Sequence, residues 1–240
     1  MDHKPPPPNW GTDKLAEFID NARGNVFASF VHLPAAYKKL LDVDGAFRLI
    51  GENVINPTNL SDAVFVLKAH SSYLGSAHLA LAGEVPEAFM LMRGCLESSM
   101  YALYLNKKPE AMKVWVARND SEEAKKLCRS EFQWSKVLAC LQAIDAATGE
   151  RVARAYNKTI DFGAHPNIAS VVAMSSVSKG KDGMRIEQAY LTEDPETIRG
   201  AMKSAAQVGV CALLVLRHVF SERFDLLGLT AKLPDLQVGL

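Results

Sequence analysis

The sequence predicts an all-α protein, a bundle of about six or seven helices with a small β-hairpin insertion near residues 168–191. Three observations support this prediction. Apolar residues recur at helical spacing over most of the chain. Proline followed by an acidic residue, which suits the first turn of a helix, recurs at Pro86, Pro109 and Pro195. One short stretch instead alternates with a period of two, as a strand does.

The chain divides into a flexible proline-rich segment over residues 1–11 and a single helical-bundle domain over residues 12–240. The first helix is expected to run towards residue 41, with Pro34 breaking or restarting it. Residues 42–60 contain Gly and Pro punctuation and are expected to form a connector with one short helix.

The later elements follow from the same start and stop signals. Ala201, Ala205 and Gly209 recur every four residues, so we expect the last long helix to let another backbone approach closely and to be central. The predicted segments are helices at 61–82, 86–106, 109–119, 121–147 and 150–162, strands within 168–178 and 184–191, and a helix at 195–226 followed by a short tail.

Composition excludes several classes of protein. The chain has 240 residues with 27 basic and 27 acidic side chains, so a strong sequence-independent attraction for nucleic acid is not expected. Its four cysteines include no Cys-x-x-Cys pair, which favours a reducing compartment. The start has no apolar signal region, and the most apolar run, 208–216, is too short for a membrane span. We therefore expect a cytoplasmic protein with no membrane partner.

Arg93 and Glu97 are the first candidate site residues. They are four positions apart, so they share one face of the predicted helix, and that face also holds Phe89, Met100 and Tyr101. Two charges in an apolar stripe need partners. The pattern fits either a structural ion pair or a polar site in the bundle, and the sequence leaves both open.

His165 is the second candidate, in a rigid turn that runs from Asp161 through Pro166 to Asn167. Asp161 is placed to fix the tautomer of the imidazole, and Tyr156 precedes the turn on the helix. The other reading of His165 is a cap of the helix C-terminus, where a partly charged imidazole favours the helix dipole.

If these side chains converge, they form one acid–base site. His165 is then the acid or base, Arg93 holds an anion, and Glu97 or Asp161 orients one of them. Tyr101, Tyr156, Asp161 and Asn167 are the candidate ligand-binding residues. No metal or other cofactor is expected: His70 and His78 are eight positions apart, too far along a helix to share one ion, and we read both as polar residues satisfied in or near the core.

The stretch from Leu91 to Ser98 that holds Arg93 and Glu97, taken with the turn that holds His165, resembles a loose set of bacterial all-helical proteins similar to the HEPN-like bundles. That resemblance implies a helical bundle, dimerisation and, in active members, metal-independent RNA cleavage by an Arg followed by a His after four to six residues. This spacing is absent here, since ten residues separate Arg154 from His165 and Arg217 adjoins His218.

Two functions follow as hypotheses. The first is a non-enzymatic helical module, a homodimer, that binds a small anionic ligand or a protein partner. The alternative is a metal-independent hydrolase or ribonuclease of a bacterial stress or defence system, acting through His165, Arg93 and Glu97. Nucleic acid is expected as a partner only in the second case.

Overall fold

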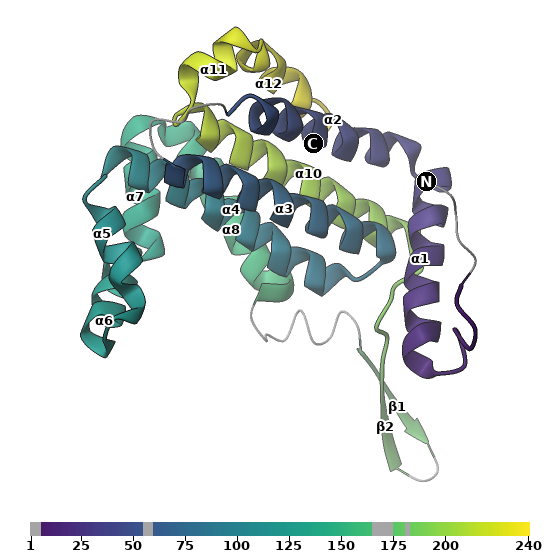
Figure 1. Ribbon diagram of the computed structural model, residues 1–240. Coiled ribbons are helices and arrows are strands. Elements are labelled where there is room, and N and C mark those ends of the chain that lie inside the picture. Colours follow the sequence, from purple (N-terminus) through teal and green to yellow (C-terminus); the bar gives the residue numbers. More distant parts are fainter. Residues whose placement is uncertain (1–5, 55–59, 165–174, 181–182) are drawn as a thin grey trace.

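The computed structural model of the chain describes residues 6–54, 60–164, 175–180 and 183–240. Within these ranges the chain is almost wholly helical, and its longest helices lie side by side as a bundle (Figure 1), in agreement with the predicted all-α class. In chain order the elements are α1 (Lys14–His32), α2 (Pro34–Glu52), α3 (Leu60–Ala82), α4 (Val85–Lys107), α5 (Ala111–Val116), η1 (Ala117–Asn119), α6 (Glu122–Glu131), α7 (Trp134–Ile144), α8 (Ala146–Thr159), η2 (Ile160–Ala164), β1 (Ser175–Gly180), β2 (Gly183–Gln188), α10 (Pro195–Arg217), α11 (Ser221–Leu226) and α12 (Leu229–Gln237).

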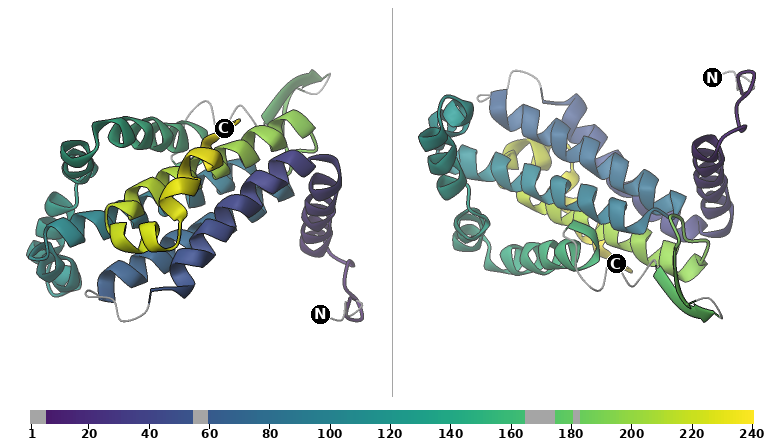
Figure 2. Two further views of the ribbon diagram at one scale, coloured as in Figure 1. Left: turned by 90° about the horizontal axis from the view of Figure 1, so that it is seen from above. Right: turned by 90° about the horizontal axis from the view of Figure 1, so that it is seen from below.

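Helix α10 is the central element of the bundle. It packs against α2, α3, α4 and α8, and Figure 2 shows α2 and α8 on opposite sides of it. Its contact with α2 and α3 is close at Gly209, where a methyl group would come within 2.5 Å of Val43 and 2.7 Å of the Tyr73 ring. The close approach of neighbouring helices that the small-residue stripe predicts is therefore present at Gly209, because this residue has no side chain to hold α2 and α3 away.

The described chain holds more helices than the six or seven that the sequence predicts. The segment 121–147 divides because the buried ring of Phe132 lies at the break between α6 and α7. Asp145 then caps α8 by accepting a hydrogen bond from the Thr148 backbone N–H at 3.0 Å, so Thr148 lies inside a helix rather than in a turn. The segment 195–226 likewise divides into α10 and α11, and the expected tail forms α12.

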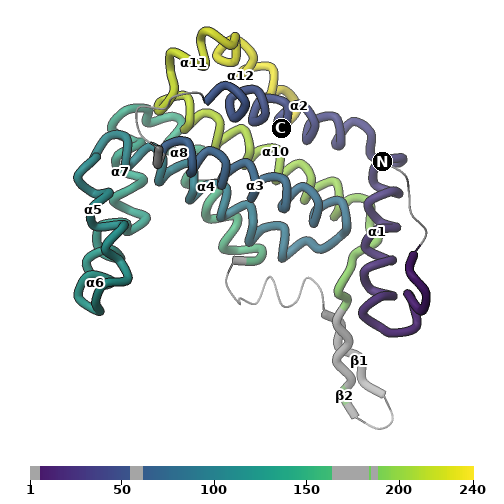
Figure 3. Tube along the Cα trace, in the orientation of Figure 1, coloured from purple at the N-terminus to yellow at the C-terminus, as the bar shows by residue number. Residues whose placement is uncertain are grey.

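The connector with one short helix that is expected over residues 42–60 is wrong for residues 42–52. They continue α2, whose Val43, Phe47 and Ile50 are buried against the rest of the bundle. Burial of these side chains outweighs the poor helix propensity of Gly45 and Gly51. Helices α11 and α12 follow α10, and α12 packs over α10 and α2 (Figure 3).

Helix α1 lies at one end of the bundle (Figure 1). Asn25 and Ser29 fasten it by donating hydrogen bonds to the carbonyls of Ala82 and Leu81 at the end of α3, both at 2.9 Å. The proline-rich lead-in is tied to the first half of the same helix, since the Trp10 indole donates to the Asp20 carboxylate at 2.8 Å.

In the range where the sequence predicts a hairpin, β1 and β2 pair antiparallel, with Val177 opposite Ile186 and Gly180 opposite Gly183. The predicted strand residues 168–174 lie outside the described residues. The candidate site is formed by polar side chains of the bundle helices and not by this hairpin.

Candidate functional site

Arg93 and Glu97 face each other on α4, as their spacing predicts. Pro86 and Glu87 occupy the first turn of this helix, and the helix continues unbroken past both charged residues. The Arg93 Nε donates to the Glu97 Oε1 at 2.7 Å, and the two side chains are 25% and 39% exposed. The pair is therefore half in solvent, so its burial is less costly than the apolar stripe suggested.

Tyr156 of α8 joins this pair from across the bundle. Its hydroxyl donates to the Glu97 Oε1 at 3.1 Å, and the centre of its ring lies 5.1 Å from the Arg93 Cζ. The Trp134 ring of α7 stacks on the same tyrosine, with centroids 3.6 Å apart and an interplanar angle of 11°. These four residues, the Arg93 cluster, connect α4, α7 and α8.

The protonation states in the Arg93 cluster keep its hydrogen bonds and ion pair in place. Burial, and then the charge of Glu97, raise the pKa of Tyr156 to about 12, so the phenol stays protonated and keeps donating. Burial lowers the pKa of Arg93, but the hydrogen bond and the charge of Glu97 raise it by more, so the net shift is upward. Because the guanidinium is matched by a carboxylate, the pair attracts a free anion less than an unmatched arginine would.

Tyr101 is a fourth predicted residue that the structure places next to the cluster. Tyr101 lies one helical turn after Glu97 and is held between the rings of Phe65 and Phe132, with centroid distances of 5.9 and 4.9 Å. Burial, and then Glu97, raise the pKa of Tyr101. It therefore acts in packing more than as a free polar group.

Asp161 lies in the π-helical turn η2, which packs on α4. The approach is close at Gly163, where a methyl group would meet the Pro86 carbonyl oxygen at 2.1 Å, and the Phe162 ring stacks on Phe89 at 5.3 Å. His165 and Asn167 lie outside the described residues, so their predicted convergence with the Arg93 cluster stays a prediction.

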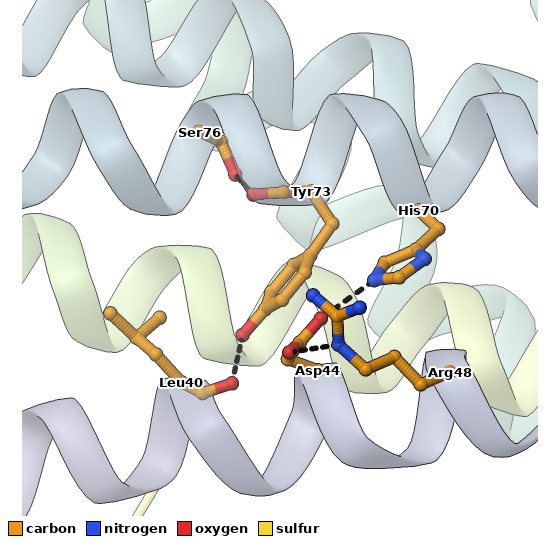
Figure 4. A network of polar contacts seen from close by, with 6 residues as sticks. All are labelled: Leu40, Asp44, Arg48, His70, Tyr73 and Ser76. Atoms are coloured by element: carbon orange, nitrogen blue, oxygen red, sulfur yellow. Dashed lines mark hydrogen bonds and ion pairs between the residues drawn. The ribbon is translucent and has the colours of Figure 1, made fainter. Parts of the chain in front are cut away.

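His70 belongs to a polar network between α2 and α3 (Figure 4). Its Nε2 lies 2.7 Å from the Asp44 Oδ1, and the Arg48 Nε donates to the other carboxylate oxygen at 2.7 Å. His70 is thus a satisfied, partly buried residue, as predicted. The same prediction for His78 was wrong, because that residue lies on the exposed face of α3.

A groove between α8 and α10 was missed by the sequence reasoning. It has a volume of about 480 Å³, and three cationic side chains of α8 line it: Arg151, Arg154 and Lys158. Its apolar side is formed by residues of α10 and the chain end, namely Val210, Cys211, Leu214 and Leu240. None of the described residues that line it is acidic.

The cations of this α8–α10 groove have mostly neutral partners. The Arg151 guanidinium donates to the Gln237 side-chain oxygen. The partly exposed Lys158 donates through its Nζ to the Oγ of buried Ser204 at 2.9 Å, and burial, helped by Lys203, lowers the pKa of this lysine. Among the described residues, only Arg154 of these three has a carboxylate within 4 Å, that of Glu150 at 3.8 Å, and both side chains are largely exposed.

One signal in the sequence marks this groove. Arg151, Arg154 and Lys158 stand at positions i, i+3 and i+7, which places three cations on one helical face. The apolar wall could not be read in the same way, since it comes from α10, about fifty residues later in the chain.

No family model, curated protein or solved structure matches this chain. In the part of the chain that the structure describes, no group of three or more His, Cys, Asp or Glu side chains is placed to hold a metal ion. Among the same residues α10 is long and apolar enough to cross a membrane, but 78% of its apolar stretch is buried inside the bundle, as in the core helix of a folded domain.

Proposed function

We propose that the protein is a non-enzymatic helical-bundle module that binds a small anionic ligand in the α8–α10 groove. The observation that supports this is the set of three cationic side chains, Arg151, Arg154 and Lys158, on a groove with no acidic residue among its described lining. Like charges on one face repel each other and destabilise the helix that carries them. An anion in the groove removes that repulsion and gains charge-assisted hydrogen bonds.

The Arg93 cluster fits this function as a support of the site. Tyr156 is on the same helix as Arg151 and Arg154, and its bond to Glu97 fixes α8 against α4. A groove whose cations are held by a rigid helix loses less conformational entropy when a ligand binds. In this interpretation Arg93 and Glu97 position α8 and do not touch the ligand.

The experiment is calorimetric titration of the whole chain with inorganic phosphate as the probe anion. The double variant Arg151→Gln/Arg154→Gln should bind phosphate at least about tenfold more weakly, since each charge-assisted hydrogen bond contributes about 1.5–3 kcal/mol. Lys126→Gln/Arg129→Gln removes two exposed positive charges at the same spacing from α6, outside the groove, and is the matched control. If the double variant binds phosphate as the wild type does, the groove is not the site.

The second candidate is a metal-independent hydrolase or ribonuclease that uses His165 with Arg93 and Glu97. One observation favours it: η2, the turn that precedes His165, packs on α4, the helix that carries the other two residues. Cleavage of a single-stranded RNA in the presence of a metal chelator tests it. Loss of that cleavage in His165→Ala, with thermal stability kept, would support the enzyme over the binding module.

A further inference from the structure

We infer that the ligand of the α8–α10 groove is a phosphate monoester carried on a flat apolar body such as an aromatic ring. This inference rests on the proposed anion-binding function and adds the chemical class of the ligand.

The charge of the groove matches a dianion. Arg151 and Lys158 have neutral hydrogen-bond partners, whereas Arg154 shares its charge with Glu150 at 3.8 Å. No acidic side chain among the described lining residues therefore compensates the charges of Arg151 and Lys158. A phosphate monoester carries about −1.5 to −2 charges at pH 7 and offers three acceptor oxygens, while a diester carries a single charge. Guanidinium groups present paired donors in the plane that such oxygens require.

The groove is larger than a phosphate group alone would fill. At about 480 Å³ it corresponds to roughly sixteen water molecules at ~30 Å³ each, whereas a bare phosphate ion has only five heavy atoms. A cleft of this size is within the usual range for small-molecule ligands. The groove therefore has room for a further body beside the phosphate.

The chemistry of the second wall indicates what that body is. Opposite the cations, Val210, Cys211 and Leu214 of α10 present their few exposed atoms to the groove, and Leu240 borders it. Burial raises the pKa of the Cys211 thiol to about 11, so this side chain is neutral and acts as a small apolar residue. A wall of this kind gains free energy by covering apolar surface, which a ring does with little loss of conformational freedom.

The experiment compares four probes by calorimetry on the whole chain: inorganic phosphate, phenyl phosphate, 1-naphthyl phosphate and diphenyl phosphate. Each added ring of a monoester should tighten binding by about tenfold, the effect of burying about 60 Å² of apolar surface. Diphenyl phosphate, with two rings but one negative charge, should bind more weakly than phenyl phosphate.

Three variants separate the contributions of the apolar wall and the cationic wall. Leu240→Asn, at the edge of the groove, should reduce the gain from the rings and leave the affinity for inorganic phosphate unchanged. Val210→Thr keeps nearly the same shape and gives the same comparison from inside α10. Arg151→Gln/Arg154→Gln should weaken every probe.

The outcomes distinguish this inference from the function on which it rests. If inorganic phosphate binds but the rings add nothing, the apolar body is refuted and the anion-binding module stands. If diphenyl phosphate binds as tightly as phenyl phosphate, the requirement for a dianion is refuted. If none of the four probes binds, the proposed function fails together with the inference.

Discussion

Replacing Gly209 by alanine tests the packing that places α10 at the centre of the bundle. The new methyl carbon would lie 2.5 Å from a Val43 methyl and 2.7 and 2.9 Å from two carbons of the Tyr73 ring, whereas carbon atoms prefer about 3.5–4.0 Å. The ring cannot easily move, because its hydroxyl donates to the Leu40 carbonyl at 2.7 Å and its face stacks on Phe47. Overpacking of this kind costs about 1–3 kcal/mol, and clashes on two sides place it near 3.

The higher helix propensity of alanine offsets part of that cost. Alanine favours a helix over glycine by about 1 kcal/mol, so the net loss for Gly209→Ala should be about 2 kcal/mol. Gly200→Ala is the matched control, since it lies on the same helix and a methyl group there would meet nothing within 4 Å. That variant should gain up to about 1 kcal/mol.

Urea denaturation measures both variants, with unchanged slopes required for the comparison. The expected difference in unfolding free energy between them is about 3 kcal/mol, the overpacking cost without the shared propensity gain. Equal stabilities of Gly209→Ala and Gly200→Ala would refute the close approach of α10 to α2 and α3.

Three further predictions concern titrating side chains. Burial and then Glu97 raise the pKa of Tyr156 from 10.0 to about 12. The contribution of this tyrosine to the free energy of unfolding is therefore complete below pH 10 and is lost as the pH rises towards 12. Tyr156→Phe should remove this part of the alkaline loss of stability, as measured by urea denaturation at a series of pH values. Asp145→Ala should cost about 1 kcal/mol at pH 7 by removing the cap of α8. Hydrogen bonds from Thr148 lower the pKa of Asp145, so the difference from wild type should shrink as the pH falls below 3.8, and parallel acid profiles would contradict this. When the thiols of the native protein are titrated, the half-buried Cys140 should react before Cys95. Burial raises the pKa of the Cys95 thiol well above its usual range, which keeps the reactive thiolate scarce. Equal reaction rates of the two cysteines would show that the core opens.

Much of the helical framework could be predicted from neighbouring residues. Pro34, Pro86 and Pro195 each stand in the first turn of a helix, and Asp194 accepts a hydrogen bond from the Thr197 backbone N–H, as its capping position predicts. Gly83 ends α3 with a positive φ of 82°, which glycine adopts without strain. These features depend on a few adjacent residues, so no knowledge of the rest of the fold was needed.

The errors in the fold came from long-range packing. The Gly-containing stretch 42–52 looks like a connector in isolation, yet burial of Val43, Phe47 and Ile50 keeps it helical. The segment 121–147 shows the reverse effect, since its helical pattern is continuous but the chain breaks beside buried Phe132. Tertiary burial decides such cases because its free energy exceeds the propensity differences.

The candidate site also has one part that the sequence predicts and one part that depends on long-range packing. The Arg93–Glu97 pair follows from positions four apart on one helix, and the structure shows it. That Tyr156 completes it could not be predicted, since 59 residues separate this tyrosine from Glu97 in sequence. The α8–α10 groove was missed for a related reason: three cations on one face of α8 become a site only when an apolar wall lies opposite.

By itself the amino-acid order determined where several helices begin, which side chains share a helical face, and that Arg93 and Glu97 lie on one face of α4. Only the tertiary structure decided which faces meet: α10 at the centre, Tyr156 against Glu97, and Arg151 across from Val210. The physical reason is that backbone geometry fixes distances within one helix, whereas distances between helices depend on how all their side chains pack together.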